Sequence, residues 1–345
     1  MRGLYALAMR RLALMTLLFA SVASAQYKER IDVVRILLDV RVTDWRGNPI
    51  GDLTTADFDV RIGGKRAEVE SVEWVQDVGP PIDEPPGLQA SEPPRESSRG
   101  RLFVVFVQTD FARETFRVSG QMNFIRYAEK MIEAFEPDDR VAVLQFDSHL
   151  KMRLDFTSNK GDVNEALRNT LSINNPPPPP VVPEPSLSSR LDKEDMRRAP
   201  DSETGLLVLG NALRNIPGPK TILLIGWGLG RLSNGRVVMP KNYERARRAL
   251  DAARTSIFAI DVPDSSSHTL EVGLQQAAAD TGGMYVKTAF FPGIAVDMMQ
   301  RALTGHYEIE LRRPDELEPG EYALDVRVKR RGANVFAPSS WRDKR

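Results

Sequence analysis

One stretch of the sequence, Leu102–Glu114 (LFVVFVQTDFARE), constrains the fold more than any other. It begins as an almost unbroken apolar run, ends in a cluster of polar residues, and is followed directly by a helical pattern. Such a run is typical of a parallel strand buried on both faces, and open α/β sheets bind ligands at the carboxyl ends of their strands. The stretch therefore predicts an α/β fold, with Asp110 at its ligand-binding edge.

A regular alternation of strand-like and helix-like patterns follows. Apolar runs of strand length occur at residues 140–146, 152–156, 221–225, 256–262 and 284–287. Helical periods cover residues 116–135, 162–171, 206–215, 243–254, 270–280 and 294–303. Strands that alternate with helices predict a doubly wound, mostly parallel sheet covered on both faces. We therefore expect one Rossmann-type α/β domain over residues 101–305.

The two flanks of this domain show the two-residue period of antiparallel strands. Residues 30–78 contain three strand patterns, separated by turn residues such as Gly63-Gly64. Residues 306–345 contain two more, joined by the turn Glu318–Glu321. We expect both flanks to build one small antiparallel β-sandwich, with the α/β domain inserted between its halves.

Two proline-rich segments interrupt these patterns. Residues 79–100 contain six prolines with glycines and serines, and we expect a linker there. Residues 174–200 form an insertion in the α/β domain with five consecutive prolines, Pro176–Pro180, which favour an extended rod. The insertion is either a tolerated surface loop or a docking segment.

The amino terminus is typical of a secretory signal peptide. Arginines precede the short apolar stretch Leu12–Ala20, and Ala23-Ser24-Ala25 offers small residues for cleavage, so we expect a signal peptide over residues 1–25. Either Met1 or Met9 is the start. The chain has no cysteine, which excludes disulfides and thiol chemistry. The mature product is expected to be periplasmic or extracellular, without a stable membrane span. Lys plus Arg and Asp plus Glu both total 47, which does not favour nucleic acid as a partner.

An ordered set of segments resembles a von Willebrand factor A-like domain of the secreted bacterial kind. The resemblance covers residues 101–305, and flanking β segments commonly accompany such domains. The segments that carry it are Leu102–Asp110, Asp138–Val143, Ala212-Leu213, Pro219–Ile225, Ser256–Val262 and Ala278–Tyr285.

The resemblance implies a metal-ion-dependent adhesion site for Mg²⁺ or Mn²⁺, and this sequence departs from it. Such a site takes Asp-x-Ser-x-Ser after the first strand, a Thr from a second loop and an Asp after the fourth strand; hard cations prefer these oxygen ligands. Here Ala112 and Glu114 occupy the two serine positions after Asp110. If the motif begins two residues earlier, Gln108, Asp110 and Ala112 occupy its three ligand positions instead. Thr204 matches the second-loop threonine, but Trp227 stands where the last acid is expected.

We therefore expect a degenerate site without a metal cofactor. If a cation binds, its ligands are Asp110, Glu114 and Thr204, with Glu114 or Asp261 as a substitute for a missing acid.

The expected function is an exported, non-enzymatic protein-interaction module. The resemblance places its ligand-binding edge at Asp110, Phe111, Arg113, Thr204 and Trp227. Trp227 has two interpretations, an exposed anchor for a protein partner or a plug over the vacated metal position. The alternatives are a cation-dependent adhesion domain and an exported hydrolase. For a hydrolase, the sequence offers only the Ser-x-x-Lys spacing of Ser148–Lys151, in an expected hairpin rather than at a helix start.

Overall fold

The computed structural model describes residues 35–77, 100–109, 128–129, 131–171, 185–262, 269–288 and 292–343. The expected signal peptide, nearly all of the expected linker and Pro176–Pro180 lie outside these residues. The predictions made for those segments therefore stay predictions.

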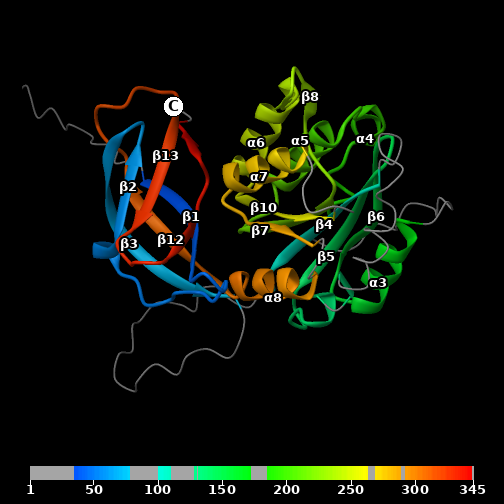
Figure 1. The fold of residues 1–345 in the computed structure, drawn as a ribbon, viewed down its shortest axis with the longest axis horizontal. Coiled ribbons are helices and arrows are strands. Elements are labelled where there is room, and N and C mark those ends of the chain that lie inside the picture. The colour runs from blue at the N-terminus through cyan, green and yellow to red at the C-terminus, as the bar shows by residue number, and fades with distance from the viewer. Residues whose placement is uncertain are drawn as a thin grey trace, which may run out of the picture. The chain divides into compact units, whose positions relative to one another are not determined.

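A six-stranded mixed sheet forms the centre of the α/β part (Figure 1). Its strand order is β11-β10-β7-β4-β5-β6. The strands are β4 (Leu102–Gln108), β5 (Arg140–Phe146), β6 (Leu150–Thr157), β7 (Lys220–Gly226), β10 (Thr255–Asp261) and β11 (Tyr285–Lys287). All neighbours are parallel except β5 and β6, which form an antiparallel hairpin. The expected mostly parallel sheet is confirmed, with one antiparallel edge strand.

Helices cover both faces of this sheet. They are α3 (Lys160–Asn169), α4 (Lys193–Arg198), α5 (Ser202–Leu213), α6 (Lys241–Ala252), α7 (Glu271–Asp280) and α8 (Pro292–Ala302). Alternate residues of β4 enter two separate cores, Phe106 on the face of α5, α6 and α7, and Val105 on the face of α3 and α8. Burial on both faces explains why this strand reads as an unbroken apolar run rather than an alternating one.

The flanking segments form a second sheet, here called the β layer. Its strands are β1 (Arg35–Thr43), β2 (Phe58–Ile62), β3 (Lys65–Gln76), β12 (Gly305–Arg312), β13 (Glu321–Val328), β14 (Asn334–Phe336) and β15 (Ser340–Arg342), and a 3-10 helix, η1 (Thr55–Asp57), precedes β2. They pair in one order, β14-β1-β12-β3-β2-β13-β15.

Strand β12 lies between β1 and β3, so segments from both ends of the chain pair directly in the β layer. The alternate residues Tyr307, Ile309 and Leu311 of β12 are buried in its core. The continuous order of seven strands does not confirm the division into two sheets that a sandwich requires. The sequence pattern could not decide this point, because a two-residue period is the same in one curved sheet and in two packed ones.

The second half of the expected proline-rich insertion is ordered structure. Leu187 is fully buried, and α4 follows it within the same segment. The carboxylate of Asp155, on β6, accepts hydrogen bonds from the backbone N–H of Leu187 at 2.7 Å and the hydroxyl of Ser186 at 2.8 Å. Residues 185–200 are thus packed against the domain, and the extended-rod expectation concerns only the polyproline that precedes them.

None of the described helices is long and apolar enough to cross a membrane.

Candidate functional site

The carboxyl ends of β4, β7 and β10 meet at one edge of the six-stranded sheet, here called the carboxyl edge. Because these strands are parallel and adjacent, the residues that follow them come together there. Of the side chains expected at this edge, the structure describes Thr204 and Trp227. Asp110, Phe111, Arg113 and Glu114 lie outside the described residues, so their roles remain predictions.

A buried amide, that of Gln108, joins three elements at the carboxyl edge. Gln108 is the last residue of β4 and is 4% exposed. Its Nε2 donates to the hydroxyl of Ser202, the first residue of α5, at 3.2 Å. Its Oε1 accepts the backbone N–H of Trp227, just after β7, at 3.1 Å. A Cβ atom at Gly226 would lie 2.6 Å from this Oε1, so a larger residue there would displace the amide from its present position. The uncharged Gln108 side chain thus connects the end of β4 with the start of α5 and with the segment after β7. A cation-dependent adhesion site would take its ligands from these segments.

The Thr204 hydroxyl is hydrogen-bonded in the first turn of α5. Asp201 is the N-cap of this helix, and its carboxylate accepts both the backbone N–H of Thr204, at 2.8 Å, and its hydroxyl, at 2.6 Å. The same hydroxyl accepts a hydrogen bond from the Nδ2 of Asn242, on α6, at 3.1 Å. These contacts account for a threonine here by helix capping, without a metal.

The indole of Trp227 is inside the protein. It is 2% exposed, which contradicts the interpretation as an exposed anchor for a partner. Of the two interpretations of Trp227, only a packed side chain agrees with this burial. Sequence could not distinguish them, because the glycines on either side of Trp227 allow the backbone to direct the ring inward or outward.

Two buried carboxylates lie near the carboxyl edge, and protein groups already hold each of them. Glu203, 3% exposed, accepts the backbone N–H of Gly230. Asp261, which is fully buried, accepts the hydroxyl of Tyr285 at 2.7 Å. Burial and this hydrogen bond raise the pKa of Tyr285 above its usual value, so the phenol stays protonated and donates. The sequence analysis had not included Glu203, which lies three residues before the helix expected at 206–215 and inside the observed α5.

Within the described part of the chain, one group of acidic and histidine side chains is close enough to share a metal ion. It is Asp39, His306 and Glu308, whose ligand atoms lie within 4.8 Å of one another. These residues belong to β1 and β12 of the β layer, not to the carboxyl edge. The guanidinium of Arg254 donates to Asp39 at 2.9 Å and to Glu308 at 2.6 Å, and His306 Nδ1 lies 2.9 Å from Asp77. The group is therefore an ion-pair network that connects the β layer to the start of β10.

The turn between β5 and β6 and the start of β6 contain Asp147, Ser148, His149 and Lys151 without the geometry of a catalytic relay. The Ser148 hydroxyl lies 3.0 Å from His149 Nδ1, and the Asp147 carboxylate lies 4.0 Å from the same nitrogen. A relay needs the nucleophile and the carboxylate on opposite ring nitrogens. Lys151 donates to Asp147 at 2.6 Å and so does not act on Ser148. Burial acts to raise the pKa of Asp147, but the hydrogen bonds from Lys151 and Ser148 outweigh it and lower that pKa to about 2.

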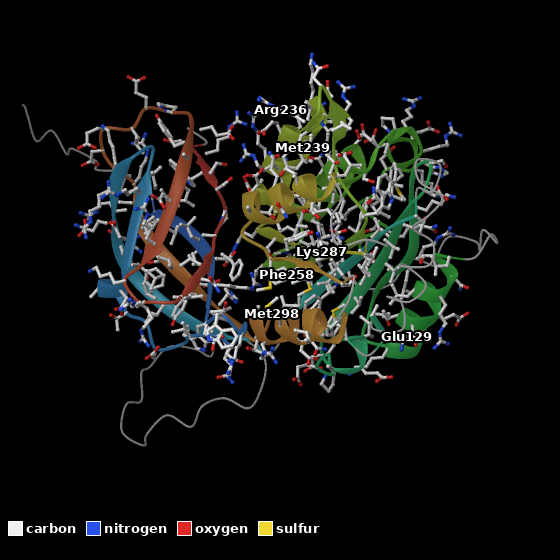
Figure 2. The ribbon with its side chains drawn as sticks, in the orientation of Figure 1. Glu129, Arg236, Met239, Phe258, Lys287 and Met298 are labelled. Carbon is white, nitrogen blue, oxygen red and sulfur yellow. The ribbon has the colours of Figure 1, made fainter. Side chains whose placement is uncertain are left out.

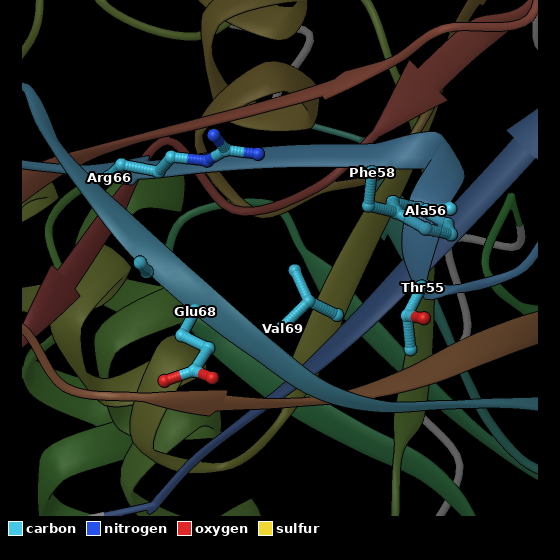
Figure 3. A pocket seen from close by; sticks show the side chains of 7 residues that line it. Thr55, Ala56, Phe58, Arg66, Glu68 and Val69 are labelled. Carbon is cyan, nitrogen blue, oxygen red and sulfur yellow. The ribbon is translucent and has the colours of Figure 1, made fainter.

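A hollow on the β layer has a volume of about 370 Å³ (Figure 3). Its lining comes from η1, β2 and β3 and consists of Thr55, Ala56, Phe58, Arg66, Ala67, Glu68 and Val69. Arg66 and Glu68 are the charged residues of this lining, and it contains no histidine or hydroxyl beyond Thr55. It therefore offers neither a nucleophile–base pair nor a set of metal ligands.

A two-stranded hairpin that the sequence analysis missed follows β7. It consists of β8 (Arg231–Ser233) and β9 (Arg236–Val238), which pair only with each other. The backbone φ angles of Asn234 and Gly235 are 49° and 73°, as a type I′ turn requires. This Asn-Gly pair was the signal that could have revealed the hairpin.

No protein-family model matches the sequence, and no curated protein matches it. Solved structures with a similar fold include the conserved hypothetical protein BatB from Bacteroides thetaiotaomicron, 12% identical with a TM-score of 0.38 over 59% of this chain and 97% of that chain. The vWF domain of the type V pili tip protein Mfa5 from Porphyromonas gingivalis is 12% identical, with a TM-score of 0.34 over 58% and 94% of the two chains. The von Willebrand factor type A structure from Catenulispora acidiphila is 9% identical, with a TM-score of 0.39 over 91% and 74%.

At these identities the likeness concerns the fold alone. The six-stranded mixed sheet with helices on both faces agrees with the resemblance to a von Willebrand factor A-like domain that the sequence indicates.

Proposed function

We propose that this chain is an exported, non-enzymatic protein-interaction module that binds its partner at the carboxyl edge. The observation that carries the proposal is the Gln108 amide. It satisfies the Ser202 hydroxyl and the Trp227 backbone N–H from within the protein, at the junction where a cation-dependent adhesion domain needs charged ligands. The Thr204 hydroxyl is likewise engaged with Asp201 and Asn242. Recognition at this edge then rests on direct contacts between protein side chains.

In this proposal the contact residues are Asp110, Phe111 and Arg113, which follow β4 in the sequence. Of the other two residues of the expected edge, Thr204 is bound to the N-cap Asp201 and Trp227 is buried, so neither is proposed as a contact with the partner. Aromatic and arginine side chains are enriched at protein interfaces, where they bury area and donate several hydrogen bonds. Phe111 and Arg113 are therefore the side chains whose loss we expect to weaken binding most.

Affinity capture tests this proposal. The chain from Gln26 to Arg345 is immobilised, exposed to the envelope fraction of the source organism, and the recovered protein is identified and titrated. We expect the dissociation constant to rise at least about tenfold in Phe111→Ala/Arg113→Ala, to be unchanged by a chelator, and to be unchanged in Arg61→Ala, an exposed arginine of β2. Failure to recover any protein, or equal capture by the variant, would remove the proposal.

A cation-dependent adhesion domain predicts a different result. A ligand that binds only the folded state at 100 times its dissociation constant stabilises the fold by about 2.7 kcal/mol. Millimolar Mg²⁺ or Mn²⁺ would then raise the unfolding temperature by several degrees, and Thr204→Val would abolish the rise. We expect no such rise, and no heat of binding in a calorimetric titration with either metal.

A further inference from the structure

Hairpin β8–β9, here called the ribbon, presents a basic face to solvent near the carboxyl edge. In the antiparallel register, Arg231 is opposite Val238 and Ser233 is opposite Arg236, so these four side chains share one face. All four are exposed. Leu232 and Val237 share the other face, where Val237 packs beside Gly230 and is half-buried. The ribbon thus has an inner face toward the protein and an outer face that carries both arginines.

The two arginines of the outer face lack acidic partners in the described residues. No ion pair joins either guanidinium to a carboxylate there, in contrast to Arg248 on α6, which pairs with Glu321 at 2.8 Å. The segment from Gly228 to Pro240 contains no Asp or Glu. Figure 2 shows Arg236 at the outer end of the ribbon, and Met239 at its base. Two like charges at diagonal positions repel each other, and a local acid that would relieve the repulsion is missing from this segment.

The ribbon keeps this arrangement through its turn rather than through a core. An isolated two-stranded hairpin is marginally stable in water. The Asn234-Gly235 turn matches the twist of the strands, and the inner face contacts the protein through Val237 and Met239. The arginines are therefore held at a defined spacing before any partner arrives, which lowers the entropic cost of binding.

We propose that the outer face of the ribbon docks an acidic, extended segment of the protein partner. Diagonal side chains across an antiparallel pair are about 7–8 Å apart, and alternate side chains of an extended strand are about 6.6 Å apart. Two carboxylates separated by one residue therefore match Arg231 and Arg236. Val238, which shares this face and is 43% exposed, provides an apolar contact beside them. The proposal rests on the proposed function and adds the chemistry of the partner segment.

A labelled peptide, Thr-Glu-Val-Glu-Thr with blocked ends, is the probe, and fluorescence polarisation with the full mature chain is the measurement. We expect binding that weakens with added NaCl, because salt screens exposed charges, and no binding of Thr-Lys-Val-Lys-Thr. Arg231→Glu/Arg236→Glu should weaken binding about tenfold or more, since two attractive pairs become repulsive. The control Arg66→Glu/Arg327→Glu changes the net charge equally on exposed strands of the β layer and should leave binding within about twofold.

Three results would overturn the proposal: no binding of the acidic peptide at millimolar concentration, equal weakening in both double variants, or full displacement of the peptide by an equal concentration of inorganic phosphate. The last would indicate a general anion site. This test is independent of partner capture. Loss of peptide binding with intact, Phe111-dependent capture removes only the ribbon, whereas intact peptide binding without any captured protein removes the proposed function.

Discussion

Asp155 anchors residues 185–200 of the proline-rich insertion, and its replacement by asparagine is a demanding test of the structure. Oδ1 accepts the backbone N–H groups of Phe156, at 2.8 Å, and Leu187, at 2.7 Å. Oδ2 accepts the Ser186 hydroxyl at 2.8 Å, and the N–H and hydroxyl of Ser188 at 3.1 and 2.5 Å. Asparagine keeps one acceptor oxygen and replaces the other by an NH2 group. This donor would face the three groups that now donate to Oδ2, which are the Ser186 hydroxyl and the N–H and hydroxyl of Ser188.

The expected loss of stability follows from these contacts. Both serine hydroxyls can rotate toward other acceptors, but the Ser188 N–H cannot. Losing a charged acceptor at a buried site and leaving a donor unsatisfied costs about 2–4 kcal/mol. With a denaturant slope of about 3 kcal/mol/M in urea, Asp155→Asn should lower the unfolding midpoint by about 1 M. The exposed Glu133→Gln serves as the control and should leave the midpoint unchanged.

The pH dependence of this loss has a definite sign. Burial acts to raise the pKa of Asp155, but hydrogen bonds from Ser188, Leu187 and Ser186 outweigh it and hold the pKa below its usual value. The stabilisation is therefore complete above the unfolded pKa of about 4 and disappears as pH falls through the lower folded pKa. The difference between wild type and variant should be constant from pH 7 to 5 and shrink toward pH 2.5.

Urea titrations monitored by circular dichroism, and trypsin digestion at Arg190 and Lys193, provide the measurements. We expect faster cleavage of the variant at these two sites. An unchanged midpoint, or a difference that grows as the pH falls, would refute the assigned role of Asp155.

Three further predictions concern other side-chain contacts. Burial raises the pKa of Asp251 to about 7 against the attraction of Arg247. The ionised carboxylate therefore lowers the stability of the folded state, and this loss grows as the pH rises from 4 to 7. In urea titrations Asp251→Asn should be more stable than wild type at pH 8, and the difference should be gone at pH 4. Arg254→Gly and Arg254→Ala both lose the ion pairs to Asp39 and Glu308. Because residue 254 has a φ of 49°, which favours glycine, the glycine variant should be more stable than the alanine variant by about 1 kcal/mol in denaturant titrations. Equal stabilities of the two variants would show that the backbone is not strained. The Tyr307 hydroxyl donates to Ile50 at 2.7 Å and accepts from Leu53 at 2.9 Å, so Tyr307→Phe should cost about 1–2 kcal/mol of thermal stability, and no change would contradict these bonds.

Local patterns predicted the elements of the α/β part well. The expected strand at residues 140–146 coincides with β5, and the helix expected at 243–254 is α6, from Lys241 to Ala252. These elements have a strong apolar period of their own, which neighbouring residues determine. The short strands β14 and β15 and the helix α4 were missed, because three to six residues are too few to show a period.

The candidate site was harder to predict because its contacts join residues that are far apart in the sequence. Gln108 is 94 residues from Ser202 and 119 residues from Trp227 in the sequence, and nothing in the local pattern shows that its amide contacts both. The sequence did indicate correctly that Trp227 stands after a strand of the sheet, but it did not decide whether the ring is buried. Whether the Trp227 ring is buried depends on the side chains that pack over it, and these come from residues distant in the sequence.

The sequence by itself therefore determined the class of fold. Its apolar periods specify which residues of each strand and helix face a core, and this information is local. Tertiary structure alone decided that β12 lies between β1 and β3, that Thr204 binds the N-cap residue of a helix, and that the exposed arginines of the ribbon face outward together. Each of these arrangements depends on the pairing or packing of chain segments in three dimensions, and a one-dimensional period does not contain it.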